Sequence, residues 1–276
     1  MKRRSRSRVG AFTLVELLVA MAVISVMAVL FLQMISWTSK SWAEGRQLAD
    51  NLGKSRAAFD IITRDVQAGI LRPDLGGFVS VDSSVPKNFC LYVARGGRGD
   101  RSISIVRYRI GANATLLRQT LPIDWDGSNS GNMAFGTTTI PSASDLDSKG
   151  SSTELVTGVV AFGIYFLNSG PKGDSPVIEN SYTNSAQSSS RALGICMIVL
   201  DERTEKLLAS QGRLDAFLSS SAWNEPGSLS RGLRAHWQAA IDSFLSGPEG
   251  ANLPQNVRTG IRVFETVVPL PNTAQR

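Results

Sequence analysis

The sequence predicts an α+β fold, with one long N-terminal helix followed by a strand-rich region that also contains shorter helices. Residues 12–32 form an apolar run with three polar residues: Thr13, Glu16 and Ser25. A second stretch with apolar residues at helical spacing follows, and Gly69 and Pro73 end it. Beyond this point, β-branched and aromatic stretches alternate with Gly-, Ser-, Asn- and Asp-rich stretches, which is typical of antiparallel strands and their turns.

The apolar run 12–32 is long enough to cross a membrane as a helix. At about 1.5 Å per residue it spans about 30 Å, which matches the hydrocarbon thickness of a bilayer. Five basic residues precede it without an acidic one: Lys2, Arg3, Arg4, Arg6 and Arg8. By the positive-inside rule, these charges hold the N-terminus in the cytoplasm and direct the rest of the chain outward.

Glu16 distinguishes this run from two ordinary alternatives. A secretory signal peptide has an apolar region of about 7–15 residues followed by a small-residue cleavage site, whereas here Gly10 and Ala11 precede a longer run. A plain membrane anchor does not explain Glu16, because a charge in hydrocarbon costs about 2.5–3.5 kcal/mol. The carboxylate therefore indicates a functional segment.

The stretch GAFTLVELLV, with its basic leader, resembles the cleavage and methylation motif of type IV prepilins and type II secretion pseudopilins. The resemblance implies that a prepilin peptidase cuts on the cytoplasmic side, before the apolar run, and methylates the new N-terminus. In that family Gly usually precedes the cut and Glu is the fifth mature residue. Cutting after Gly10 makes Glu16 sixth, and cutting after Ala11 makes it fifth. The Ala11–Phe12 bond is favoured, and both bonds remain open.

This processing suggests an assembly role for Glu16. Where apolar helices bundle side by side, the positive amine of a neighbouring subunit's Phe12 can neutralise the carboxylate at only one axial stagger. Buried ionic groups are well suited to setting such a register. The resemblance also implies three partners, namely other pilin-like subunits, the prepilin peptidase and an inner-membrane assembly platform. It implies no cofactor.

The expected organisation is pilin-like. Residues 1–11 form the leader, residues 12–68 the long helix with 12–32 transmembrane, and residues 69–276 a globular head with a helical insertion near 204–246. The protein would sit in the bacterial inner membrane as a single-pass subunit, with its N-terminus cytoplasmic and its head periplasmic, before it enters a filament.

The second half of the long helix is expected to be amphipathic and to pack on the head. Its apolar stripe follows a heptad spacing: Leu48, Leu52, Ser55, Phe59, Ile62 and Val66. Leu52, Phe59 and Ile62 are predicted to face the head domain. Charges on the other faces form opposite pairs at i,i+4, as on a solvated helix surface.

The head is predicted to contain six strands: 88–94, 102–110, 114–121, 155–167, 192–200 and 260–269. Two loops, 124–150 and 168–191, are long, and two amphipathic helices are expected at 207–218 and 229–244. The order of four segments, SRAAFDIITRDVQAG, LVTGVVAFGIYFLN, ICMIVLDE and GIRVFETVVPLPN, is loosely similar to the J-type minor pseudopilins of type II secretion.

Net charge and cysteines say little about partners. Removing the five basic leader residues from the formal charge of +6 leaves +1, so nucleic-acid binding is not favoured. Cys90 and Cys196 lie in strand-like runs. An exported chain meets an oxidising compartment, so a disulfide between them stays open beside the alternative of two buried thiols.

No catalytic constellation is found in the sequence, so an enzyme is not predicted. His236 is the single histidine, and no second ligand has metal-binding spacing. The segment 124–132 gathers oxygen ligands but lacks EF-hand spacing, so a polar turn is preferred to a calcium loop. Six arginines between Arg95 and Arg118 carry the alternative function, a minor pilin that binds DNA or a surface. A solvated loop and an outward strand face are preferred there.

Overall fold

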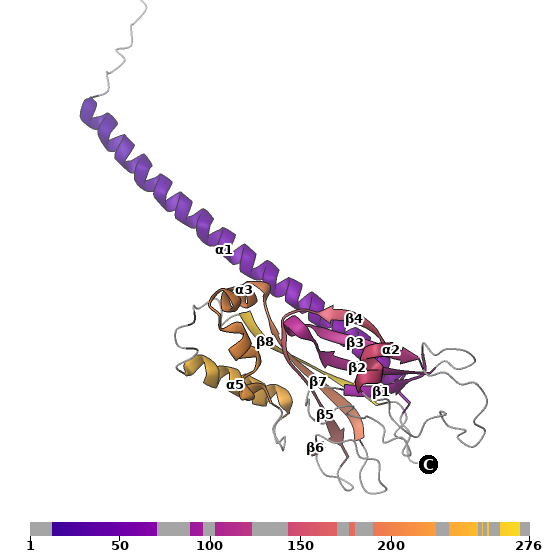
Figure 1. Cartoon of the computed structure of the whole chain (residues 1–276). Coiled ribbons are helices and arrows are strands. Elements are labelled where there is room, and N and C mark those ends of the chain that lie inside the picture. Colours follow the sequence, from indigo (N-terminus) through magenta and orange to yellow (C-terminus); the bar gives the residue numbers. More distant parts are fainter. Residues whose placement is uncertain are drawn as a thin grey trace, which may run out of the picture. The chain divides into compact units, whose positions relative to one another are not determined.

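The computed structural model describes residues 13–70, 89–95, 103–122, 143–169, 177–179, 190–224, 232–247, 250, 253 and 260–270. The chain divides into two compact units, Met1–Asp50 and Asn51–Arg276, which are described separately. Figure 1 shows the α+β composition, with a long helix, two β-sheets and several short helices. The predicted fold class is therefore confirmed.

Helix α1 (Leu14–Gln67) confirms the predicted long N-terminal helix. It ends where the sequence indicated, because the Gly69 N–H donates to the carbonyl oxygen of Val66 at 3.0 Å instead of continuing the α-helical pattern. A Cβ atom at Gly69 would lie 2.8 Å from that same oxygen, so this tight exit favours glycine. Gly69 then forms an isolated antiparallel bridge with Val93.

The first sheet, sheet A, has the order β1-β2-β3-β4 and is antiparallel throughout. Its strands are β1 (Phe89–Val93), β2 (Ser104–Ile110), β3 (Leu116–Pro122) and β4 (Ser151–Val156). A short 3-10 turn, η2 (Ala112–Ala114), joins β2 to β3. Helix α2 (Ala143–Lys149) precedes β4, within the stretch that the sequence predicted to be a loop.

The second sheet, sheet B, has the order β6-β5-β7-β8 and is also antiparallel. Its strands are β5 (Val159–Asn168), β6 (Val177–Glu179), β7 (Ser190–Leu200) and β8 (Ile261–Pro269). The single strand predicted over 155–167 is wrong, since it divides into β4 of sheet A and β5 of sheet B. Gly158 adopts a φ of +76°, which turns the chain between the two sheets.

Short helices fill the connection between β7 and β8: α3 (Glu202–Ser210), α4 (Leu214–Leu218), the 3-10 turn η3 (Ser221–Trp223) and α5 (Leu233–Ser246). The Asp201 side chain caps α3 by accepting a 2.5 Å bond from the Thr204 N–H. The single helix predicted over 207–218 is interrupted, because Gly212 has a φ of +64° and the chain starts a new helix after it.

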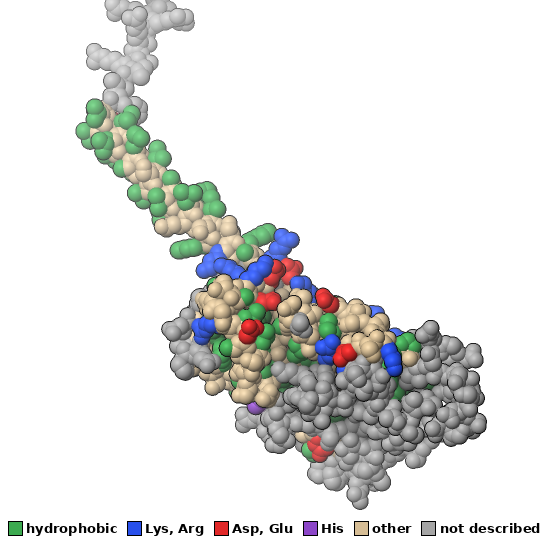
Figure 2. Space-filling model, in the orientation of Figure 1, with side chains coloured by type: hydrophobic (Ala, Val, Ile, Leu, Met, Phe, Trp, Pro, Cys, Tyr) green, Lys and Arg blue, Asp and Glu red, His purple; other side chains and the backbone are tan. Residues whose placement is uncertain are grey.

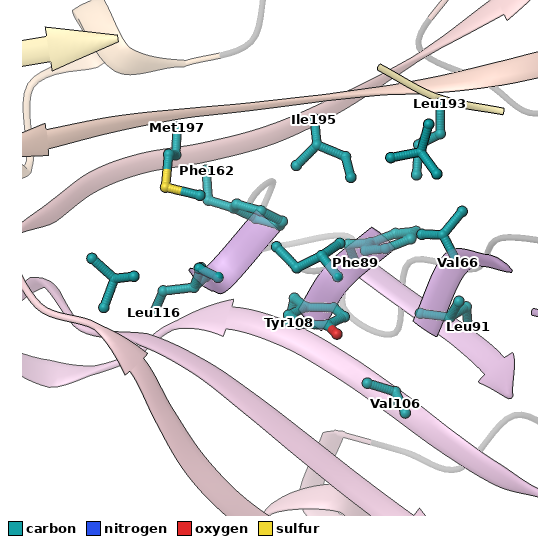
Figure 3. Close-up of a cluster of buried hydrophobic side chains, with 14 of the residues drawn as sticks. Val66, Phe89, Leu91, Val106, Tyr108, Leu116, Phe162, Leu193, Ile195 and Met197 are labelled. Atoms are coloured by element: carbon teal, nitrogen blue, oxygen red, sulfur yellow. The ribbon is translucent and has the colours of Figure 1, made fainter. Parts of the chain in front are cut away.

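The main core lies between the inner faces of the two sheets and the second half of α1. It contains Ala58, Ile62 and Val66 from α1 together with buried residues of both sheets. Figure 3 shows Phe89 and Tyr108 of sheet A beside Phe162 of sheet B. A second cluster packs α3–α5 on the other face of sheet B, around Trp223 and Trp237, and α2 covers the outer face of sheet A through Leu146.

The predicted stripe on α1 is correct for Phe59 and Ile62 and wrong for Leu52. Ile62 is fully buried and Phe59 packs against the main core, whereas the Leu52 side chain is 47% exposed. Ser55, one turn later, is the first residue of α1 that is buried among those described. Leu52 has the right phase on the helix but lies one turn before the region that the head covers.

Candidate assembly site

The first turn of α1 is closed by a reciprocal pair of hydrogen bonds between Thr13 and Glu16. The Glu16 N–H donates to the Thr13 hydroxyl oxygen at 3.3 Å, and the Thr13 N–H donates to Glu16 Oε2 at 3.5 Å. This is a capping box, which satisfies backbone N–H groups that have no partner in the first helical turn. The carboxylate also lies at the positive end of the helix dipole.

This cap was not among the predicted features, although its pattern is present in the sequence. Thr-x-x-Glu directly before an apolar helical run is the pattern of a capping box. The carboxylate of Glu16 therefore has a local partner within its own chain, in addition to any partner that it meets in an assembly.

The stretch after Glu16 is apolar and exposed on every side. By length and composition, Leu14–Ala43 is the one helix in the described part of the chain that is suited to crossing a membrane. Figure 2 shows hydrophobic side chains along this part of α1. The Ser25 and Thr38 hydroxyls donate to the carbonyl oxygens of Met21 and Met34, each at 2.8 Å, so neither hydroxyl needs an outside partner.

The structure places only part of the predicted processing and assembly site. Glu16 lies in the first turn of α1, as described above. Gly10, Ala11 and Phe12 lie outside the described residues. The cleaved bond, the methylated residue and the assembly role of Glu16 therefore stay predictions.

A buried ion pair fastens the last turns of α1 to sheet A. Asp65 is 4% exposed and accepts two bonds from the Arg118 guanidinium, at 2.7 Å from Nε and 3.1 Å from Nη2. The Tyr108 hydroxyl donates to the same carboxylate. Burial, reinforced by the Asp65 charge, raises the pKa of the Tyr108 phenol, so the hydroxyl stays a neutral donor. This arrangement positions the helix on the sheet.

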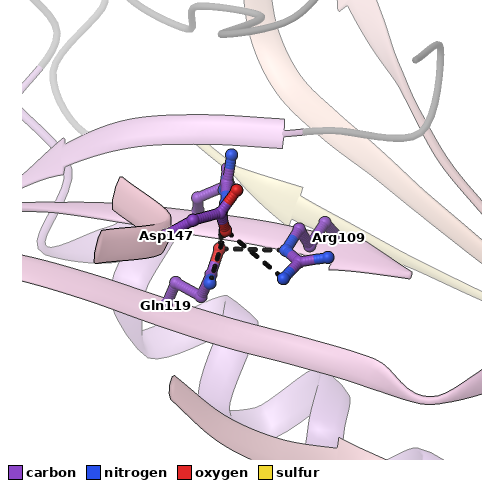
Figure 4. Close-up of polar contacts among 4 residues, drawn as sticks. Arg109, Gln119 and Asp147 are labelled. Atoms are coloured by element: carbon purple, nitrogen blue, oxygen red, sulfur yellow. Dashed lines mark hydrogen bonds and ion pairs between the residues drawn. The ribbon is translucent and has the colours of Figure 1, made fainter. Parts of the chain in front are cut away.

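Three of the six arginines in the predicted basic patch, Arg107, Arg109 and Arg118, pair with carboxylates of the same chain. Arg107 is 1% exposed and donates from Nε to Gln119 Oε1 at 2.7 Å, and it also pairs with Asp147 of α2. Arg109 donates to the same Gln119 oxygen at 3.1 Å and lies 3.3 Å from the Asp147 carboxylate. Figure 4 shows Arg109 and Gln119 converging on Asp147.

The expectation of an outward, solvated strand face is therefore wrong for Arg107, which is buried, whereas Arg109 stays 31% exposed. Helix α2 covers that face, and its Leu146 is buried there. The hydrogen bond from Gln119, together with the charges of Arg107 and Arg109, lowers the pKa of Asp147. Arg118 is held by Asp65, and Arg95 is exposed. Arg98 and Arg101 lie outside the described residues, so the proposed binding surface loses three of its six cations.

The remaining candidate residues offer no reactive site in the described part of the chain. Cys90 and Cys196 are not bonded to each other; both are free and buried, in separate clusters. Burial raises the pKa of the Cys90 thiol to about 12 and also raises that of Cys196, so neither is a ready nucleophile. His236 is exposed, and no group of three metal-ligating side chains occurs among the described residues. The candidate calcium segment 124–132 lies outside them.

Comparison with known families agrees with the predicted N-terminal methylation motif. The family model for the prokaryotic N-terminal methylation motif matches residues 6–32, which contain the small residues, the apolar run and Glu16. No curated protein matches the chain. The motif occurs on proteins that are structural subunits, and here it continues into a membrane-anchoring helix. The match therefore supports a type IV prepilin-like or pseudopilin N-terminus for this chain.

Proposed function

We propose that the chain is a minor pseudopilin, a non-enzymatic subunit of a pilus-like filament that serves protein secretion. One observation carries the proposal: a methylation motif over residues 6–32 leads into an exposed apolar helix whose single acidic residue is Glu16. The proposal divides the chain into a leader over residues 1–11, a helix over 12–68 and a head over 69–276.

Processing is the first step of this function. The prepilin peptidase hydrolyses the bond before Phe12 and methylates the exposed amine, while the basic leader stays in the cytoplasm. The apolar helix remains in the inner membrane after cleavage, with the head on the periplasmic side. The mature subunit then joins other pilin-like subunits at an inner-membrane assembly platform.

Assembly depends on the carboxylate of Glu16. In the separate subunit, the cap with Thr13 gives the carboxylate a local partner, and the dipole of its own helix favours the negative charge. In the filament, the methylated amine of a neighbouring chain supplies a full positive charge. Because the rest of the stretch is apolar, this ionic contact favours one axial register over all others.

The second half of α1 transmits that register to the head. Ala58, Ile62 and Val66 are buried in the main core, and Asp65 is bonded to Arg118 and Tyr108 of sheet A. Apolar packing is tolerant of small shifts, whereas a two-bond ion pair requires one geometry. The position of the helix in a filament would therefore set the position of the head.

Variants of Glu16 test the proposal and separate charge from capping. Glutamine at this position preserves a capping box but removes the charge, whereas alanine removes both. We expect cleaved Glu16→Gln to co-isolate less with other pilin-like subunits than the wild type does, and Glu16→Ala to fall further. Breaking one side of a buried ion pair costs about 3–5 kcal/mol, roughly a 100-fold or greater loss in association.

Ser25→Ala is the matched control, because it alters a polar side chain of the same helix that bonds only to its own turn. This variant should assemble as the wild type does. Wild-type co-isolation of Glu16→Ala would refute the assembly role. Wild-type co-isolation of Glu16→Gln alone would assign Glu16 to helix capping instead of charge pairing.

A further inference from the structure

Three amphipathic side chains, Trp37, Lys40 and Trp42, lie at the far end of the apolar stretch of α1 and are called the girdle below. Trp37 and Trp42 are 72% and 80% exposed, and the exposed Lys40 lies between them. Neither indole belongs to a buried cluster among the described residues. Two large exposed indoles beside a lysine are unusual on a surface that faces water alone.

The angular arrangement of the three residues argues against a single protein partner. At about 100° per residue, Trp42 lies about 140° around the helix from Trp37, and Lys40 lies about 60° from Trp37 in the opposite direction. Residues that dock on one partner helix repeat at three and four positions and share a face. Trp37 and Lys40 share a face, whereas Trp42 lies on the opposite side of the helix, as contact with a medium that surrounds the helix requires.

The chemistry of the girdle matches the boundary between lipid headgroups and acyl chains. Tryptophan is enriched at this boundary because its ring is apolar and its N–H can reach water or a headgroup. Lysine places its methylene groups along apolar surface while its ammonium reaches the phosphates. The Thr38 hydroxyl between them donates to the Met34 carbonyl oxygen at 2.8 Å, so it needs no outside partner.

The distance from the girdle to Glu16 matches the thickness of a bilayer. Trp37 follows Glu16 by 21 residues, which is about 31 Å along the helix at about 1.5 Å per residue. The hydrocarbon core of a bilayer is about 30 Å thick. With the girdle at one boundary, Glu16 therefore lies at the other, where its carboxylate and capping bonds meet polar surroundings.

We propose that Trp37, Lys40 and Trp42 bind the headgroup–acyl boundary of the bilayer and hold the unassembled helix at the depth that keeps Glu16 out of the hydrocarbon. The apolar helix Leu14–Ala43 is longer than the hydrocarbon is thick, so apolar length alone leaves its depth undetermined. Interfacial aromatic and basic residues fix the depth of such a helix in the membrane. This inference rests on the membrane insertion assigned above and adds the position of the helix in the membrane.

Depth-dependent quenching of tryptophan emission tests the proposal. The full chain, with Trp125→Phe because that residue lies outside the described ones, is reconstituted into phosphatidylcholine–phosphatidylglycerol vesicles. The lipids carry bromine either near the carbonyl region or near the bilayer centre. Trp223 and Trp237 are buried in the head and contribute a constant background. The emission of Trp37 and Trp42 is obtained by difference from Trp37→Phe/Trp42→Phe.

We expect bromines near the carbonyl region to quench the emission of Trp37 and Trp42 at least about twofold more than bromines near the bilayer centre do. Phe31→Trp, added with the girdle intact, is the control for depth, because it lies six residues closer to the bilayer centre, about 9 Å. Its emission should be quenched more by the deep bromines. In Trp37→Ala/Trp42→Ala the preference of the Phe31→Trp probe for deep bromines should weaken, as the helix loses its fixed depth.

Two outcomes would overturn the proposal while leaving the proposed function intact. In the first, bromines near the bilayer centre quench the emission of Trp37 and Trp42 most. In the second, neither bromine position quenches this emission although the Phe31→Trp probe is quenched, which would mean that water or another protein covers the indoles. Loss of quenching at Phe31→Trp as well would show that the apolar stretch is outside the bilayer. That result would refute both this inference and the membrane insertion on which it rests.

Discussion

The Arg118 guanidinium donates two hydrogen bonds to the Asp65 carboxylate, joining the last turns of α1 to strand β3 across 53 residues of sequence. Asp65 is buried and Arg118 is partly covered, so each charge depends on the other for its solvation. The pair is the polar counterpart of the apolar contacts that Ile62, one turn earlier, and Val66, the next residue, make in the main core.

Substituting Asp65 should strongly destabilise the head. Asp65→Ala leaves Arg118 without its carboxylate and removes the acceptor of the Tyr108 hydroxyl, so we expect a loss of about 3–5 kcal/mol in the free energy of unfolding. Urea unfolding of a soluble fragment beginning near Gly45 measures it. Arg95→Ala, at an exposed arginine, is the control and should change stability by no more than about 0.5 kcal/mol. Equal effects of the two variants would contradict the role assigned to the pair.

Asp147 should make the head sensitive to acid. Its pKa is lowered in the folded state by the bond from Gln119 and by Arg107 and Arg109, so its contribution to stability is complete above its ordinary pKa of 3.8. The contribution is lost as the pH falls from that value towards the lower folded pKa. Asp147→Asn should therefore show a smaller drop in melting temperature than the wild type between about pH 5 and pH 3. Identical acid profiles would show that the carboxylate is not coupled to these arginines.

Truncations along α1 should separate the part that the head covers from the part that it does not. Ile62→Ala removes a fully buried side chain from the main core and should cost about 2–5 kcal/mol. Leu52→Ala, ten residues earlier on the same helix, alters a side chain that is 47% exposed and should cost about 0.5 kcal/mol or less. Chemical denaturation of the same soluble fragment compares the two. A large effect at Leu52 would indicate that it packs against parts of the head that the structure does not describe.

The mature N-terminus should be a methylated Phe12. This start makes Glu16 the fifth mature residue and leaves Thr13 in place to close the capping box. Mass spectrometry of the protein purified from membranes gives the mass of the N-terminal peptide. A peptide that starts at Ala11 would move the cut by one bond, whereas cleavage after residue 32 would contradict the prepilin assignment.

Local pattern was sufficient for the membrane helix and for most of the strands. The exit of α1 at Gly69 and the strands near Phe89, Ser104 and Ile261 follow from apolar periodicity and from glycine, which are properties of neighbouring residues. The capping box of Thr13 and Glu16 is equally local, because Thr-x-x-Glu before an apolar run is its sequence pattern.

Sequence by itself determined that this protein enters a membrane, carries a prepilin-type methylation motif and combines one long helix with antiparallel strands. Only the tertiary structure decided that Arg107, Arg109 and Arg118 are internal partners of Asp147 and Asp65 and not a basic surface. The physical reason is that hydrophobic periodicity reports which face of an element is buried, whereas an ion pair depends on which distant element packs there. Arg118 and Asp65 meet because sheet A and α1 share one core, and no local spacing records that contact.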